Sequence, residues 1–295
     1  MKKHISFIVC LSMILFLCVK SYALADNSNR NPLVYNGDSV VIIKGDSEMP
    51  EAMLRNIEKT KNAEHRRANK NQMYEEYLKT QRLLKASVNH RNGPDQTDAI
   101  ISISLDVYQN PQDNDSYCGY ACLQSVLEYW GIYKSQTQIA AEANESRPQL
   151  DWFYGYDWQA TDINCYPAAV YLNSINEEYY YEPFNGYFGT YNSTQFLNKV
   201  LFDIDQVEEP TLVDGLSASY NTNSQLPNYP SNMDIRHWIV IDGYKWDNMT
   251  QSVSEITFVD PAKSSAVSWS STISAYSSTT VSNMFNFALG RGIIW

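Results

Sequence analysis

The apolar and polar positions divide the chain into three parts. An apolar run from Ile5 to Val19 comes first. Residues 26–98 are mostly polar, and their apolar residues recur at wide, helix-like intervals. From Ala99 onward, apolar residues are dense and alternate between helical and strand spacing. We therefore expect a leader, an exposed helical segment and one folded domain at residues 99–295.

The leader has the features of an export signal. Lys2 and Lys3 precede the apolar run, and an Ala-Leu-Ala cleavage site at residues 23–25 follows it. An uncleaved membrane anchor is the alternative, but an apolar run of about fifteen residues is short for a span that usually needs about 20. We expect residues 1–25 to be a signal peptide cleaved after Ala25, and the mature protein to be secreted or held at the cell surface. No later segment is apolar enough to predict a transmembrane span.

Residues 26–98 predict little globular structure of their own. Residues 39–43 are typical of a short strand, and residues 52–88 of one or two exposed helices with few apolar anchors. Asn89 to Pro94 interrupts the helical pattern and predicts a linker.

Charge separates this segment from the domain. Residues 26–99 carry 12 Lys/Arg and 11 Asp/Glu, whereas residues 100–295 carry 7 and 22. Between Glu51 and Arg91 there are ten basic and five acidic residues, so this helical segment is basic. The whole chain has a formal charge of −11, which argues against a nucleic-acid partner because phosphate contacts need clustered Lys and Arg. Two interpretations of the segment stay open: a pro-segment docked on the acidic domain by charge complementarity, or a solvated spacer or stalk.

Within the domain, helices come first and strands later, which is typical of an α+β fold with a mainly antiparallel sheet. A helix from Cys118 to Trp130 is expected to be the central one, because it carries an apolar stripe at helical spacing. Gly131 ends this helix, and Ser135 caps the next. The other expected elements are a strand at 101–107, helices at 162–172 and 194–202, and strands at 210–213, 237–244, 255–259, 264–273 and 285–295.

The reactive side chains of the domain are few. His237 is its single histidine, and Cys118, Cys122 and Cys165 are its cysteines. The chain has no H-E-x-x-H, C-x-x-C, G-x-S-x-G, G-x-G-x-x-G or Walker motif. We therefore expect no metal, no cofactor and no serine nucleophile. An odd number of cysteines leaves at least one thiol unpaired within the chain.

Cys118, His237 and Asp260 supply a candidate nucleophile, base and orienting group. Cys118 is expected in the first turn of a helix, where the helix dipole stabilises a thiolate. His237 opens one apolar strand and Asp260 ends another, so the carboxylate can fix the tautomer of the imidazole. The alternative is a packed cysteine, a core histidine and an aspartate that only forms a turn.

Gln112 is the candidate for stabilising an oxyanion. It lies six residues before Cys118, so its side-chain amide and the Cys118 N–H can bind the oxygen of a tetrahedral intermediate. Gln109 is a weaker candidate because it lies three residues further upstream.

Other residues compete with these assignments. Asp234 and Asp242 are alternative partners for the histidine, but Asp242 shares its strand and points to the opposite face. Cys122 is expected to be buried one helical turn after the candidate nucleophile, and Cys165 to be buried alone or paired with Cys122.

Three stretches of the domain resemble a known family. Gln112 to Gly131 (QDNDSYCGYACLQSVLEYWG) is similar to the catalytic helix of the bacteriocin-processing (double-glycine) peptidase-like family of papain-fold cysteine peptidases. Residues 236–244 (RHWIVIDGY) resemble its histidine strand, and residues 259–261 (Val-Asp-Pro) its Asp-Pro strand end. The resemblance implies a papain-like fold with a central N-terminal helix on a mainly antiparallel sheet. It implies Cys118 as nucleophile, His237 as base, Asp260 as orienting group and Gln112 in the oxyanion hole.

Tyr120 departs from the family pattern, which usually has proline at this position, and this predicts a looser entry to the helix. The resemblance implies a thiol peptidase that hydrolyses amide bonds of a peptide or protein substrate. The same residues would serve an amidase or an acyl transferase. Outside enzymes, the alternative is a non-catalytic papain-fold module for binding or adhesion.

Overall fold

The computed structural model describes residues 33–36, 39–42, 49–88, 100–154, 162–185, 191–289 and 291–295. The expected signal peptide at residues 1–25 and the expected linker at residues 89–94 lie outside the described residues. No helix in the described part of the chain is long and apolar enough to cross a membrane. The boundaries drawn between leader, basic segment and domain stay predictions of the sequence.

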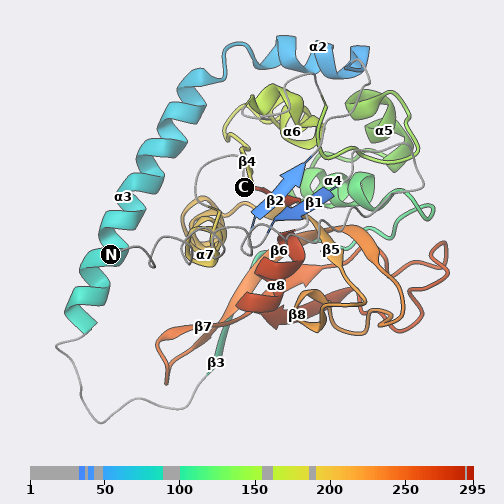
Figure 1. Ribbon diagram of the computed structural model, residues 1–295. Helices are drawn as coiled ribbons and strands as arrows, with labels where there is room; N and C mark the ends of the chain where they lie inside the picture. The colour runs from blue at the N-terminus through green and yellow to red at the C-terminus, as the bar shows by residue number, and fades with distance from the viewer. Residues whose placement is uncertain are drawn as a thin grey trace, which may run out of the picture.

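A seven-stranded antiparallel sheet forms the centre of the domain (Figure 1). Its strands are β3 (Ile100–Ser104), β4 (Pro183–Phe184), β5 (Thr211–Ser217), β6 (Ile235–Asp247), β7 (Ser252–Val259), β8 (Tyr276–Thr280) and β9 (Gly292–Ile294). They follow the order β4-β9-β5-β6-β7-β8, and β3 pairs with the second half of β6. A separate hairpin pairs β1 (Leu33–Asn36) with β2 (Ser39–Ile42).

Seven α-helices accompany the sheet in the described residues. They are α2 (Glu51–Thr60), α3 (Glu64–Val88), α4 (Cys118–Tyr129), α5 (Gln136–Asn144), α6 (Pro167–Ile175), α7 (Ser193–Phe202) and α8 (Val281–Ala288). A π-helical turn at Asp203–Val207 extends α7. The helix α4 packs on β6, and α5 packs on both α4 and α6. The domain is therefore α+β, with the expected helix packed on an antiparallel sheet.

Local signals begin and end the helices around the candidate nucleophile as the sequence predicts. Gly131, just after α4, has a φ of 76°, a left-handed conformation that favours glycine. The Ser135 hydroxyl accepts a hydrogen bond from the Gln138 N–H, and the Gln138 side chain accepts one from the Ser135 N–H. This capping box satisfies two donors at the start of α5.

Alternate residues of β6 are buried in different apolar clusters. Trp238 and Val240 belong to a cluster with side chains of α4, α5 and α6. Ile239 and Ile241 belong to a second cluster with side chains of α7 and α8. Since successive side chains of a strand point to opposite faces, β6 is covered on both faces. This explains its long apolar run.

The expected strand at residues 285–295 is wrong in its first part, because residues 285–288 form the end of α8. The Thr280 hydroxyl accepts a hydrogen bond from the Asn283 N–H and caps the helix. Met284 and Phe287 are buried three residues apart on one face of α8. Only the short β9 follows as a strand.

The expected strand at residues 264–273 is also wrong. The N–H groups of Val267, Ser270 and Ile273 each donate to a carbonyl three residues earlier, so this stretch consists of turns. The edge strand of the serine-rich region is β8, which pairs with β7. The first strand of the domain, β3, is shorter than expected, and all five of its side chains are exposed instead of alternating.

Candidate active site

Cys118 is the first residue of α4, so its side chain lies at the positive end of the helix dipole. Tyr117 at the N-cap makes no side-chain capping bond to the first turn. A Cβ at Gly119 would lie 2.6 Å from Leu150 Cβ and 3.2 Å from Trp238 Cδ1, so glycine allows this end of α4 to approach its neighbours closely. The Cys118 side chain is partly exposed, as a nucleophile must be.

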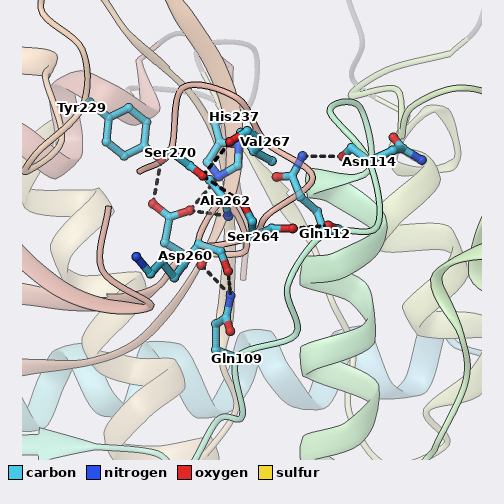
Figure 2. A network of polar contacts seen from close by, with 11 residues as sticks. Gln109, Gln112, Asn114, Tyr229, His237, Asp260, Ala262, Ser264, Val267 and Ser270 are labelled. Atoms are coloured by element: carbon cyan, nitrogen blue, oxygen red, sulfur yellow. Dashed lines mark hydrogen bonds and ion pairs between the residues drawn. The ribbon is translucent and has the colours of Figure 1, made fainter. Parts of the chain in front are cut away.

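His237 lies near the start of β6, and Asp260 directly follows β7. Pairing of Val240 with Val259 brings these two strand ends together. The His237 Nε2 atom lies 2.9 Å from Asp260 Oδ1, and both side chains are buried (Figure 2). The Cys118 thiol is close enough to the same imidazole to raise its pKa. Because Asp260 engages Nε2, the ring nitrogen that remains for the thiol is Nδ1.

Further donors hold the Asp260 carboxylate. The Ala262 N–H donates to Oδ1 at 2.8 Å, and the Tyr229 hydroxyl donates to Oδ2 at 2.7 Å. Gln109 Nε2 donates to the Asp260 carbonyl at 3.0 Å and so holds the backbone. Figure 2 shows these groups arranged around Asp260 from different parts of the chain. A buried carboxylate with this set of donors is fixed in position.

The charge on Asp260 controls the proton affinity of His237. Burial lowers the pKa of the imidazole, but the Asp260 charge, the hydrogen bond to Asp260 and the Cys118 thiol together raise it to about 10. The pKa of the Tyr229 hydroxyl lies well above its ordinary value, because of burial first and the Asp260 charge second, so Tyr229 remains a donor. An imidazolium next to a thiol stabilises the thiolate. The raised pKa therefore favours the charged imidazolium beside the thiol near neutral pH.

Gln112 is buried in the loop that joins β3 to α4. Its N–H donates to the Pro261 carbonyl at 3.0 Å, and its carbonyl accepts from the Ser264 hydroxyl at 2.7 Å. Its side-chain Nε2 donates to the Asn114 carbonyl at 2.7 Å (Figure 2). No described residue hydrogen-bonds its buried Oε1. The bond to Asn114 engages one of the two protons on Gln112 Nε2 within the loop.

Gln109 differs from Gln112 in how its amide is used. Its Nε2 donates to the Asp260 carbonyl at 3.0 Å and to the Lys263 carbonyl at 3.3 Å. Both amide protons are then bound to backbone oxygens, which leaves none for a reacting group.

Asp234 and Asp242, the alternative partners for His237, have other surroundings. Asp234 accepts hydrogen bonds from the N–H and the hydroxyl of Ser219. Asp242 is buried, which raises its pKa to about 6. The structure therefore pairs His237 with Asp260 and with neither of these two.

The remaining sequence candidates are packed in the core. Cys122 and Cys165 are both buried, and no disulfide joins them. Burial raises the pKa of Cys122 well above its ordinary value. Tyr120 is fully buried, and its hydroxyl donates to the Arg147 carbonyl at 3.1 Å. The packing accommodates tyrosine where the family usually has proline.

Two aromatic residues beside His237 were missed by the sequence analysis. The Tyr229 ring lies edge-on to the imidazole, with centroids 6.1 Å apart, and the Trp269 ring does so at 5.8 Å. Tyr229 comes from the stretch between β5 and β6, and Trp269 from the stretch between β7 and β8. Neither residue belongs to a local motif, so only the fold could reveal their proximity.

The comparisons with known proteins agree with the resemblance seen in the sequence. Within the described residues, no group of three or more His, Cys, Asp or Glu side chains could hold a metal ion. Searches of curated proteins and of solved structures found no match. The profile described as the Peptidase_C39 like family matches residues 104–284, which is more than half of the chain. The protein therefore belongs to the Peptidase_C39-like family, and this membership indicates a cysteine peptidase.

Proposed function

We propose that this protein is a secreted cysteine peptidase that cleaves amide bonds of peptides or proteins through Cys118, His237 and Asp260. Membership of the Peptidase_C39-like family supports the class of reaction. The hydrogen bond between His237 and Asp260, and the effect of the Cys118 thiol on the pKa of the imidazole, support the assignment of roles. The leader sequence supports export, which places the substrate outside the cytoplasmic membrane.

In the proposed reaction, the Cys118 thiolate attacks the carbonyl carbon of the scissile amide and forms a C–S bond. The carbonyl electrons move onto oxygen. As the C–N bond breaks, the His237 imidazolium gives its Nδ1 proton to the leaving amine. Neutral imidazole then takes a proton from water, which hydrolyses the thioester and releases the acid and the thiol. Asp260 holds the Nε2 proton and the ring orientation throughout.

Gln112 and the start of α4 are the proposed oxyanion site. The first N–H groups of a helix have no partner within the helix, so the Cys118 N–H can donate to the developing oxyanion. Gln112 Nε2 carries a second proton besides the one given to Asn114. The bonds from its backbone to Pro261 and Ser264 hold this amide in place.

One observation carries the proposal. A partly exposed cysteine at a helix start shares the single histidine of its domain with a buried carboxylate. Alkylation by iodoacetamide near pH 6, followed by peptide mass spectrometry, tests it. We expect Cys118 to be labelled much faster than Cys122, and His237→Ala to abolish the difference. His65→Ala, on the exposed face of α3, is the matched control and should change nothing.

Loss of hydrolysis in Cys118→Ala, assayed on a mixed peptide substrate by the new amino termini released, tests the reaction itself. Products with new amino termini identify a peptidase, whereas release of ammonia alone identifies an amidase. Slow labelling at equal rates for Cys118 and Cys122 would contradict the proposal and favour a non-catalytic binding module.

A further inference from the structure

The basic segment in front of the domain lies along its outer surface as α2 and α3 (Figure 1). We call residues 51–83 the strap. Its helices pack on α5, α6 and α7, which are all elements of the domain. The character of these contacts decides whether the strap is a removable cover or a part of the fold.

Arg66 of the strap satisfies carbonyl groups at the end of α6. Its guanidinium donates to the Asn173 carbonyl at 3.2 Å, to the Tyr179 carbonyl at 3.0 Å and to the Asn176 carbonyl. The last carbonyls of a helix have no partner within it, and a cation there also interacts favourably with the helix dipole. Without Arg66, the end of α6 loses a partner that no neighbouring residue of that helix supplies.

Lys70 carries a buried charge into the domain. Only 2% of its surface is exposed, and its Nζ donates to the Tyr180 carbonyl at 3.0 Å and lies 3.8 Å from the centroid of the Trp295 ring. Burial lowers the pKa of Lys70 to about 8, and the charge of Asp203 is the largest influence that opposes this. Burial likewise raises the pKa of Asp203, and Lys70 is the largest influence that lowers it. Lys70 and Asp203 thus compensate each other's buried charge.

Arg67 adds an ion pair at the rim of the same contact. Its guanidinium lies 2.7 Å from Glu182 Oε1, and the Glu182 side chain is 12% exposed. Arg66, Arg67 and Lys70 together form what we call the cationic cluster. All three cations come from just over one turn of α3, and all bind groups between Asn173 and Glu182.

Apolar side chains of the strap belong to the core of the domain. Met53 is fully buried and packs in a cluster with Tyr154 and Val170. Tyr77 is buried, and its ring lies edge-on to that of Phe202 with centroids 5.6 Å apart. Removal of the strap would expose these surfaces to water, which costs free energy in proportion to the apolar area.

The start of α2 also depends on the domain. Pro50 provides no side-chain cap, and instead the Ala52 N–H donates to Glu145 Oε1 at 2.9 Å. Asn56 Nδ2 donates to the Glu142 carbonyl at 2.9 Å. The strap is therefore attached at both of its helices by bonds to α5 and to the stretch after α6.

We propose that the strap is a permanent structural part of the catalytic domain, held by the cationic cluster, which stays bound after the chain is cut between residues 88 and 100 and leaves Cys118 accessible. The hydrogen bonds and ion pairs of the strap within the described residues do not reach Cys118, His237 or Asp260. An inhibitory pro-segment must cover its nucleophile, whereas this segment occupies the side formed by α5, α6 and α7.

The test uses the full chain with a recognition sequence for a site-specific protease inserted within residues 89–99. After cutting under native conditions, we expect both pieces to elute together from gel filtration in equal amounts, and the alkylation rate of Cys118 to change less than twofold. Separate elution of the strap, or a severalfold rise in alkylation rate when it leaves, would overturn the proposal. Co-elution does not require catalysis, so this result is independent of the proposed peptidase function.

Variants of the same cleavable chain identify what holds the strap. The triple change Arg66→Ala, Arg67→Ala and Lys70→Ala is expected to release the strap after cutting. The matched control removes three exposed cations of the strap, through Lys59→Ala, Lys61→Ala and Lys79→Ala, and should retain it. Arg67→Gln alone, a milder change for the case in which the triple variant does not fold, is expected to speed dissociation. Equal retention in Arg67→Gln and the control triple would refute the role of the cationic cluster.

Discussion

Asp260→Asn removes the negative charge beside His237 and keeps the shape of the side chain. An asparagine Oδ1 can still accept from the imidazole and from the Ala262 N–H, and the Tyr229 hydroxyl can rotate to accept from the new amide. The contacts of the wild-type carboxylate, at 2.9, 2.8 and 2.7 Å, therefore have counterparts in the variant. The substitution changes electrostatics far more than packing.

The size of the effect follows from the geometry. An imidazolium and a carboxylate whose nearest atoms are 2.9 Å apart attract by roughly 6 kcal/mol at an effective dielectric constant of about 20. A rise in the pKa of His237 from 6.5 to about 10 corresponds to about 5 kcal/mol, at about 1.36 kcal/mol per pKa unit. Loss of even a third of this energy lowers the proton affinity of the His237 imidazole by more than about tenfold.

The assay is the rate of iodoacetamide alkylation of Cys118 from pH 5 to pH 9. We expect Asp260→Asn to reduce the rate near pH 6 at least tenfold, and the rate to recover toward pH 9 as the thiol ionises without help. Asp234→Asn, which changes a carboxylate bonded to Ser219, is the control and should leave the profile unchanged. Identical profiles for Asp260→Asn and the wild type would refute the assigned role of the charge.

The remaining predictions concern pH, the oxyanion site, the helix start and the support of Asp260. Because the pKa of His237 is raised from 6.5 to about 10, the stability that protonated His237 gives the fold is complete below about pH 6.5 and is lost as pH rises toward 10. The melting temperature of Asp260→Asn should therefore lie furthest below that of the wild type near pH 6. A difference in melting temperature that widens toward pH 10 would contradict this. Gln112→Ala should reduce kcat by about 10²–10³ with little change in KM, whereas an equal loss in Gln109→Ala would count against the choice of Gln112. Gly119→Ala should lower stability in urea unfolding, because the new methyl group meets Leu150 Cβ at 2.6 Å; an unchanged midpoint would show that the helix start can shift. Tyr229→Phe should cost about 1.5–3 kcal/mol in the same assay, since it removes a donor from a buried charge, and an unchanged free energy of unfolding would show that Asp260 is held without it.

Features that depend on neighbouring residues could be predicted from the sequence. The helix at Cys118–Tyr129, its end at Gly131 and the cap at Ser135 all follow from local spacing and capping chemistry. The antiparallel sheet followed from the late run of strands. The choice of candidate catalytic residues could also be narrowed, because a domain with a single histidine offers few pairs of nucleophile and base. The roles assigned to Cys118 and Gln112 stay predictions for the experiments above.

The spacing of apolar residues failed to predict secondary structure where different elements have similar spacing. Short apolar runs fit a helix, a strand or successive turns, and tertiary contacts decided among them at residues 264–273 and 285–295. The second stretch begins inside α8, a helix that Thr280 caps and that buries Met284 and Phe287 on one face.

Contacts between residues distant in the chain could be found only in the fold. Tyr229 meets Asp260 across 31 residues, and Arg66 meets Tyr179 across 113. The sequence shows the strap as basic and poor in apolar anchors. Lys70 is nevertheless buried, and the charge of Asp203 offsets part of its lost hydration. Composition records which charges exist, whereas the distance between opposite charges, and hence their energy, is set by the tertiary structure.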